Sequence, residues 1–332
     1  MAERCGQNTL FMGAVEGTYG TINKTIELKA GCKFNYVEVV PEMAIPRNTG
    51  QIVTDIMESD KDISYVDCTV EGVLTKSMLN FLLELLTGDD EAGDSADIWT
   101  HNNSCARPGA SLYRYTDIGT LETPTDDVYD VVTGAILTQF VLNFQQGSPV
   151  TFSATFKGEA LTRETTNATT NALILTAVTD ASHPNDDIAK YSDLSVVLGG
   201  AAITAFNGGT LTLTNELAGD DILFQNSDTI INPVIVRAGG TLTASWIYDA
   251  DNDPHINSNI QSTAQLDLVT ILIGTVHQYS FSTYGKVESY ENPEVDRGKM
   301  MGSFTKKIMG NIDEVVPTAA LTITYTDLTP AE

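Results

Sequence analysis

Positive charge is scarce in this chain. Its 332 residues include 18 Lys and Arg against 44 Asp and Glu, which gives a formal net charge of -26. A nucleic-acid-binding domain grips phosphates with a basic patch, so the composition argues against a binder of that kind. The acidity is compatible with a protein that must keep nucleic acid from sticking, with general solubility, or with a saline habitat.

Cysteine motifs and long apolar runs are missing too. None of the four cysteines has C-x-x-C spacing, so a zinc or redox motif is unsupported. Residues 1–20 contain no continuous apolar segment, and no stretch is long enough for a membrane helix. We therefore expect a soluble protein without a secretion signal and without a membrane partner.

Recognisable catalytic and metal-binding patterns are absent. The four histidines stand at no metal-ligand spacing. Residues 249–253 resemble the start of a calcium loop, but Pro254 stands where that loop needs glycine and Ile260 where it needs an acid. No nucleophile elbow, P-loop or dinucleotide fingerprint occurs. We expect no enzyme, no cofactor and no metal site, and favour a structural or binding protein.

The clearest pattern present is a pair of alternating segments within residues 133–158, separated by turn residues at 146–149. Side chains on a strand alternate between its faces, so this pattern predicts a β-hairpin with one apolar and one polar face. The polar face is nearly free of charge, and its residues are Gln139, Asn143, Gln145, Thr151, Ser153 and Thr155. The apolar face is formed by Phe140, Leu142, Phe144, Phe152 and Phe156.

One helix is predicted, at residues 75–86. Thr75 is suited to the N-cap and Gly88 stands where a C-terminal glycine belongs. Most of its side chains are apolar, including Met78, Leu82 and Leu86, while a narrow polar stripe recurs every fourth residue. Such a helix must be covered on most sides, so we expect these three residues to pack with the apolar face of the hairpin.

The rest of the chain is mainly β in pattern. An acidic surface loop is expected at 89–97, and residues 294–307 allow a short helix. Strands are predicted at 21–28, 33–40, 62–73, 108–115, 210–214, 241–246, 266–273, 275–284 and 319–326.

Weak repetition over roughly 150 residues favours two domains. We expect an arm at 1–20, a first β domain at 21–160 with the helix at 75–87, a linker at 161–190, and a second β-rich domain at 191–332. Residues 266–287 would supply a second hairpin.

The order of these features resembles the major tail tube protein of long-tailed, siphovirus-like bacteriophages. The resemblance rests on the strand and helix at 70–88, the strand at 111–113, and the hairpin at 134–158, where a glycine precedes the first strand and Gly158 ends the second. The distal half is similar through 206–217, 239–246 and 285–293.

The resemblance implies tail-tube-type β-sandwich or barrel domains with one flanking helix. Subunits of such proteins form rings, contribute strands to a continuous barrel, and stack into the tube through which DNA is ejected. The family's usual ring holds six tube domains, so two tandem domains would close as a trimer with pseudo-sixfold symmetry. The alternative is a hexamer in which the second half is a peripheral decoration.

The implied location is the tail of the virion, after synthesis in the host cytoplasm. The implied partners are other copies of the chain, the tape measure protein, and the tail terminator and distal tail proteins. DNA would be non-specifically translocated cargo. We expect the polar face of the hairpin to line the channel and Lys157 to lie near the barrel rim, beside Glu159, or at a contact between rings.

Other functions are compatible with the same patterns. Threonine-rich strands and acidity also occur in secreted or surface adhesins and S-layer-like modules. A baseplate or decoration protein could share the tube fold.

Overall fold

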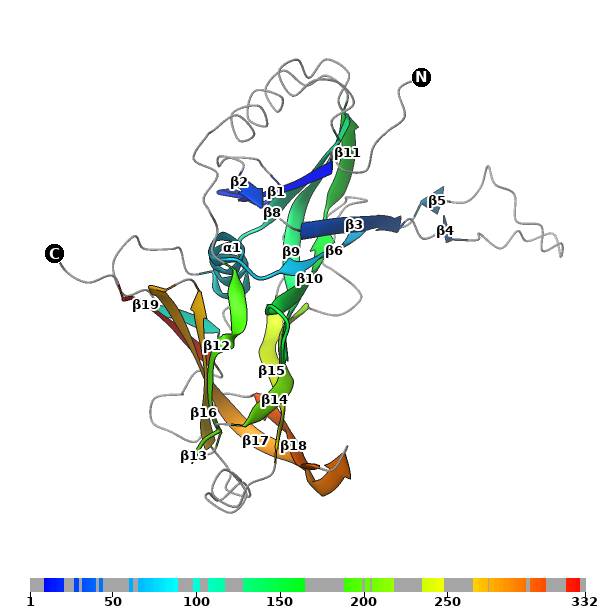
Figure 1. Cartoon of the computed structure of the whole chain (residues 1–332). Coiled ribbons are helices and arrows are strands. Elements are labelled where there is room, and N and C mark those ends of the chain that lie inside the picture. The colour runs from blue at the N-terminus through cyan, green and yellow to red at the C-terminus, as the bar shows by residue number, and fades with distance from the viewer. Residues whose placement is uncertain are drawn as a thin grey trace, which may run out of the picture.

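The computed structural model describes residues 9–20, 27–29, 32–39, 42–43, 60–61, 65–88, 98–101, 107–116, 128–164, 188–198, 201–203, 205–217, 235–247, 265–273, 275–296, 299–308 and 321–328. These residues form antiparallel β-structure with one helix (Figure 1). The predicted acidic loop at 89–97 and the calcium-like stretch at 249–253 lie outside the described residues. No helix in the described part is long and apolar enough to cross a membrane.

The elements in chain order are β1 (Thr9–Val15), β2 (Glu27–Lys29), β3 (Cys32–Val39), β4 (Glu42–Met43), β5 (Asp60–Lys61), β6 (Tyr65–Val73), α1 (Lys76–Thr87), β7 (Ile98–His101), β8 (Ala110–Thr116), β9 (Val128–Gln145), β10 (Thr151–Gly158), β11 (Ala160–Glu164), β12 (Ala189–Leu198), β13 (Ala201–Ala202), β14 (Phe206–Leu217), β15 (Ile235–Ile247), β16 (Gln265–Ile273), β17 (His277–Asp296), β18 (Lys299–Ile308) and β19 (Leu321–Asp327).

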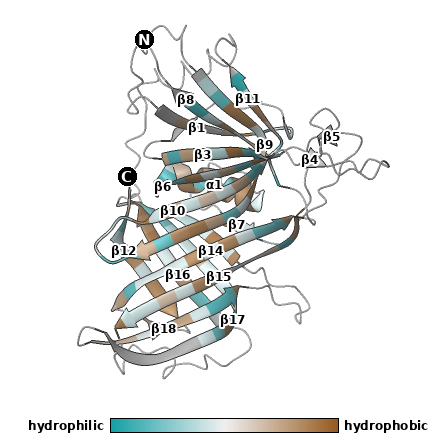
Figure 2. Cartoon of the chain, turned by 90° about the vertical axis from the view of Figure 1, so that its right-hand side faces the viewer, coloured by the Kyte–Doolittle hydropathy of each residue, from teal (hydrophilic) through white to brown (hydrophobic). Residues whose placement is uncertain are grey.

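Eight strands form a broad, curved sheet, which we call the front sheet. Its order is β3, β6, β10, distal β9, β14, β15, β18 and distal β17, and all neighbours are antiparallel. Distal β9 means residues 136–145 and distal β17 means residues 286–296. Figure 2 shows β3, β6, β10, β14, β15 and β18 in this order from top to bottom.

Two smaller sheets lie against the same strands and form the back layer. In the first, β1 pairs with β2 and β8, and residues 128–135 of β9 pair with β8 and β11. In the second, β12 pairs with β13 and β16, residues 277–285 of β17 pair with β16, and residues 277–283 pair with β19. The strand β7 completes the second back sheet by pairing with β19. The long strands β9 and β17 thus each run from a back sheet into the front sheet.

Gly134 lies where β9 leaves the first back sheet. Its φ of +61° is in the left-handed region that favours glycine, and an added Cβ would come within 2.8 Å of Glu159 Cβ. The buried Glu16 carboxylate fixes this bend, because its Oε1 accepts hydrogen bonds from Gly134 N–H (3.0 Å) and Ser111 Oγ (2.6 Å).

The predicted helix is present and its predicted caps are confirmed. At the N-terminal end, the Thr75 side-chain oxygen accepts a hydrogen bond from Met78 N–H (3.4 Å). At the C-terminal end, Gly88 has a left-handed conformation and its N–H donates to Glu84 O. The hairpin β9–β10 is also confirmed, with Gly147 at φ +81° in its turn. A hairpin, β16–β17, occupies the region predicted for a second hairpin of the same kind, but it lies in the second back sheet, and the front-sheet counterpart of β9–β10 is β17–β18.

The described residues within 294–307 form no helix, and that prediction is wrong. The segment holds the end of β17 and most of β18, which pair with each other from Gly285↔Ile308 to Asp296↔Lys299. Local composition misled the prediction: Lys306 points into the core and so breaks the apolar alternation of a strand. At the N-terminus, the expected arm contains β1, whose seven residues pair with β8.

Candidate functional site

The outward face of the front sheet carries a continuous band of small polar side chains, which we call the front face. Directly opposed residues in an antiparallel pair lie on the same face, so the register traces this band across strands. One row is Asn35–Thr69–Thr155–Gln139, from β3 to β9. A second row is Thr210–Thr243–Thr305–Ser289, from β14 to β17.

The six polar hairpin residues all lie on the front face. Gln139, Asn143 and Gln145 are exposed. Thr151, Ser153 and Thr155 are half-buried on β10. The register joins the two strands directly, with Asn143 opposite Thr151 and Gln139 opposite Thr155.

The second half of the chain extends this face through residues that the sequence reasoning did not single out. Asn143 lies opposite Thr210, whose hydroxyl donates to Asn143 Oδ1 (3.3 Å). Further along, Ser245 lies opposite Ser303. The alternation of Thr210 to Thr214 was visible in the sequence, but only the β9–β14 pairing puts it beside the hairpin.

Three lysines on the front face have a local partner. Lys33 Nζ lies 4.0 Å from Glu71, and Lys307 Nζ lies 3.9 Å from Glu288. Lys157 Nζ lies 4.0 Å from the centroid of the Tyr65 ring, a cation–π contact. The two ion pairs are solvent-exposed and add little stability, yet they offset positive charge on this face.

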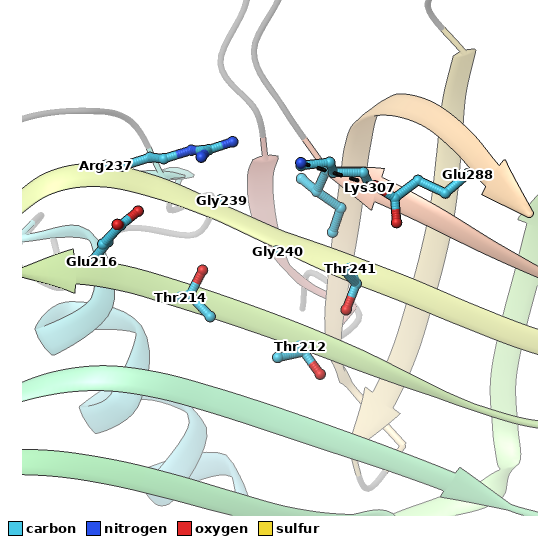
Figure 3. A pocket seen from close by; sticks show the side chains of 10 residues that line it. Thr212, Thr214, Glu216, Arg237, Gly239, Gly240, Thr241, Glu288 and Lys307 are labelled. Atoms are coloured by element: carbon cyan, nitrogen blue, oxygen red, sulfur yellow. Dashed lines mark ion pairs between the residues drawn. The ribbon is translucent and has the colours of Figure 1, made fainter.

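A shallow hollow interrupts the front face between β14, β15 and β18 (Figure 3). Its floor is open because Gly239, which lies opposite Thr214 on this face, carries no side chain, and its rim includes Glu216, Arg237 and the Lys307–Glu288 pair. Gly240 is required here, since an added Cβ would lie 2.2 Å from Thr212 O on the neighbouring strand.

The opposite face of the front sheet is apolar and buried. The hairpin residues that were expected in the core lie there together with the helix residues in one cluster: Met78, Leu82, Leu86, Phe140, Leu142, Phe144, Phe152 and Phe156. Each has at most 3% of its side chain exposed. Burying this many large apolar groups holds the front and back layers together.

A buried polar junction ties the two halves of the chain. Asn215 on β14 donates to Leu86 O at the end of α1 (3.2 Å) and to Leu137 O on β9 (3.1 Å). Its Oδ1 lies 2.9 Å from His101 Nε2 on β7. Arg107 Nε also donates to Leu86 O (2.7 Å).

The contact with Asn215 makes His101 Nε2 the donor, so the neutral ring leaves Nδ1 without a proton. Nδ1 is buried and has no hydrogen-bond partner in the described structure. Burial lowers the pKa of His101 to about 4, and the nearby Arg107 cation acts in the same direction. The ring is therefore a neutral structural element at physiological pH.

Within the described ranges, no three His, Cys, Asp or Glu side chains gather in a way that could hold a metal ion. The front face is a wide surface lined mainly by hydroxyl and amide groups, with charged side chains of both signs among them.

Comparison with protein families bears on what this surface belongs to. A family model described as phage tail tube protein matches residues 6–326, nearly the whole chain. The chain belongs to the phage tail tube protein family. A comparison with curated proteins returned no match.

Membership confirms the resemblance drawn from the sequence. A tail tube protein has a structural role, is not an enzyme, and resides in the tail of the virion. It assembles with further copies of itself to build the tube. The mainly β architecture, with one helix among the described residues, confirms that part of the predicted fold class.

Proposed function

We propose that three copies of this chain close into a ring in which each copy supplies two tube-like units. The front sheets of the three copies would join into one barrel, with the front face lining the channel. Stacked rings would then form the conduit through which DNA leaves the capsid.

The matching neighbours of β9 and β17 support two units per chain. Along one edge, β9 pairs with β11 and then β10, as β17 pairs with β19 and then β18. The other edge is paired with β8 and β16 respectively. The pairs β1–β8, β3–β6 and β6–β10 have counterparts in β12–β16, β14–β15 and β15–β18.

A shared β-bulge strengthens the correspondence. The β9–β10 register shifts between Gln139 and Leu137, and the β17–β18 register shifts between Ser289 and Val287. Bulges disturb a ladder and are retained as specific features of a fold. On this basis we assign the first unit to β1–β11, with the expected boundary near residue 160 moved past β11, and the second unit to β12–β19.

The in-line pairing of β9 with β14 argues against a hexamer with a decorating second half. Seven consecutive residue pairs, from Gln139↔Thr214 to Gln145↔Gly208, continue the first unit's sheet directly into the second. A peripheral decoration would have no reason to extend the channel-forming sheet by four strands.

The stagger of this sheet suits a barrel of three chains. Thr210 begins the second row as Asn35 begins the first, so a sheet without stagger would pair Gln139 with Thr210. Gln139 instead pairs with Thr214, four residues farther along β14. A shift of four residues per four strands is about 13 Å along the strands for about 19 Å across them, a tilt of about 35°. Three chains then give a backbone diameter of about 45 Å, whereas six full chains give about 90 Å and one chain about 15 Å.

The chemistry of the front face suits passage of a duplex about 20 Å wide. Cations that bind phosphates release counterions and hold DNA, so a conduit must present few free ones. Amides and hydroxyls predominate, three lysines lie beside Glu71, Glu288 and the Tyr65 ring, and Arg237 lies opposite Glu216, so few free cations face the polyanion. We further propose contacts of the ring stack with the tape measure, tail terminator and distal tail proteins.

Lysine substitution of the channel wall tests this function. Gln139→Lys with Asn143→Lys should assemble normally, because both positions are exposed, and should slow DNA ejection severalfold at low salt. Gln139→Glu with Asn143→Asp is the matched control and should eject at the wild-type rate. Unchanged ejection in the lysine variant at low salt would contradict a channel-lining role.

A further inference from the structure

The front sheet ends in two open edges within the described structure. At one end, β3 pairs with β6 alone; at the other, distal β17 pairs with β18 alone. Open edges invite pairing with another chain, and proteins normally cover them. A closed ring requires these two edges to meet.

We infer that β3 of one copy pairs with distal β17 of the next in a single register, which the β9–β14 pairing within the chain already specifies. This inference rests on the proposed ring. It adds the two strands that meet, their antiparallel direction and the residues that face each other.

The register follows from corresponding positions in the two units. Through the shared bulge, Gln139 corresponds to Ser289. Through the rows on the front face, Thr210 corresponds to Asn35, and Thr214 to Val39. Because Gln139 pairs with Thr214, Ser289 is expected to pair with Val39 of the neighbouring copy.

The same mapping continues along both strands. The pair Val141↔Thr212 within the chain corresponds to Glu291 of one copy opposite Val37 of the next. Beyond the second irregularity of β17, between Glu291 and Glu294, Gln145↔Gly208 translates to Asp296 opposite Lys33. Opposite charges directly across antiparallel strands stabilise the pair, so the predicted register brings a favourable contact to the seam.

The side chains of β3 are less buried than those of its counterpart β14, as expected if a strand of a neighbouring copy packs beside β3. Leu211 on β14, which is covered by the first unit, is fully buried, whereas its counterpart Tyr36 on β3 is only partly buried. On the front face of β3, Val37 is 63% exposed.

Charge also differs between the two edges. Beside β3, the buried Asp130 carboxylate holds two guanidiniums, Arg114 Nη2 and Arg163 Nε, each at 2.6 Å. Arg114 also donates to Tyr36 OH (2.7 Å), which links this excess of positive charge to β3. Distal β17 carries Glu288, Glu291, Glu294 and Asp296 against a single lysine, Lys286. The charges of Lys33 and Glu38 on β3 cancel, so the first edge keeps one net positive charge, from Arg114 and Arg163 against Asp130, to complement the acidic second edge.

Cysteine cross-linking in assembled tubes tests the register. Val37→Cys with Glu291→Cys should form a disulfide between neighbours, because directly opposed residues have Cα atoms within disulfide range. The matched control, Val37→Cys with Ser289→Cys, is two residues out of register and should not cross-link, since diagonal neighbours lie about 7–8 Å apart. Peptide mass spectrometry excludes bridges to native cysteines.

The number of cross-linked chains on non-reducing gels tests the strand register and the trimeric ring separately. A ladder ending at three chains supports both the register and the trimer, and one ending at six supports the register while contradicting the trimer. Tubes of three-chain rings with no bridge, or with bridges in the control, would overturn the register alone.

If the double variants do not assemble, amide hydrogen exchange of the wild type gives a second reading. Residues 33–39 and 286–296 should gain protection on tube formation, and unchanged exchange there would overturn the inference.

Discussion

Acid should weaken this protein through one buried histidine, and the structure gives the size of the effect. His101 donates through Nε2 to Asn215, while its Nδ1 is buried without a partner. Protonating Nδ1 would put a charge into the core with no acceptor and near Arg107. This is the cause of the pKa of about 4 in the folded chain, against 6.5 for the ring in its ordinary state.

The sign and size of the pH effect follow from that difference. Between pH 6.5 and pH 4 the unfolded chain binds the proton and the folded chain does not, so folding stability falls as the pH falls. The contribution is fully present above pH 6.5 and is lost by about pH 4. A difference of about 2.5 pKa units corresponds to about 3 kcal/mol of unfolding free energy.

The perturbation that isolates this effect is His101→Gln. The glutamine amide can still donate to Asn215 Oδ1 but takes up no proton in this range. Urea unfolding of the unassembled chain can be followed through tryptophan fluorescence, because Trp99 on β7 is buried two residues before His101.

We expect the wild type to lose about 3 kcal/mol more than the variant between pH 7.5 and pH 4. Carboxylates titrate in both proteins, so their contribution cancels in the comparison. Parallel pH profiles for the two proteins would refute the reasoning.

Two further predictions concern the second unit. Gly240→Ala should destabilise the chain by about 3 kcal/mol because its Cβ meets Thr212 O at 2.2 Å, whereas Gly239→Ala, with its nearest contact at 3.6 Å, should change the unfolding free energy by less than about 0.5 kcal/mol. Equal effects in thermal unfolding would contradict this account. Asp267→Ala should cost about 3–5 kcal/mol by stranding the fully buried Lys306, and adding Lys306→Met should recover most of it. If denaturant unfolding shows no recovery in the double variant, the stranded Lys306 charge is not the cause of the lost stability, and this prediction is contradicted.

Features encoded by neighbouring residues could be predicted from the sequence. The helix was recoverable because Thr75 and Gly88 bracket a single apolar run, and the β9–β10 hairpin because its alternation is broken only at the turn. The family followed from the order of such local signals.

Features that depend on distant contacts could not be predicted in this way. Asn215 and His101 are 114 residues apart, and nothing near either one indicates their contact. The strand that contains Lys306 could not be predicted, because a lysine can be buried there only beside partners on other strands. Lys306 Nζ lies 2.9 Å from Asp267 Oδ2 and 2.9 Å from Thr283 O. The stagger between β9 and β14, on which the ring geometry depends, exists only in the folded sheet.

The central claim is that three chains, each with two units, form a ring whose channel is lined by the front face. A cryo-EM map of assembled tubes tests it most directly. The account predicts three chains per ring, with Gln139, Asn143 and Thr210 on the channel wall and β3 beside distal β17 of the neighbour. Six chains per ring, or a front face turned away from the channel, would contradict it.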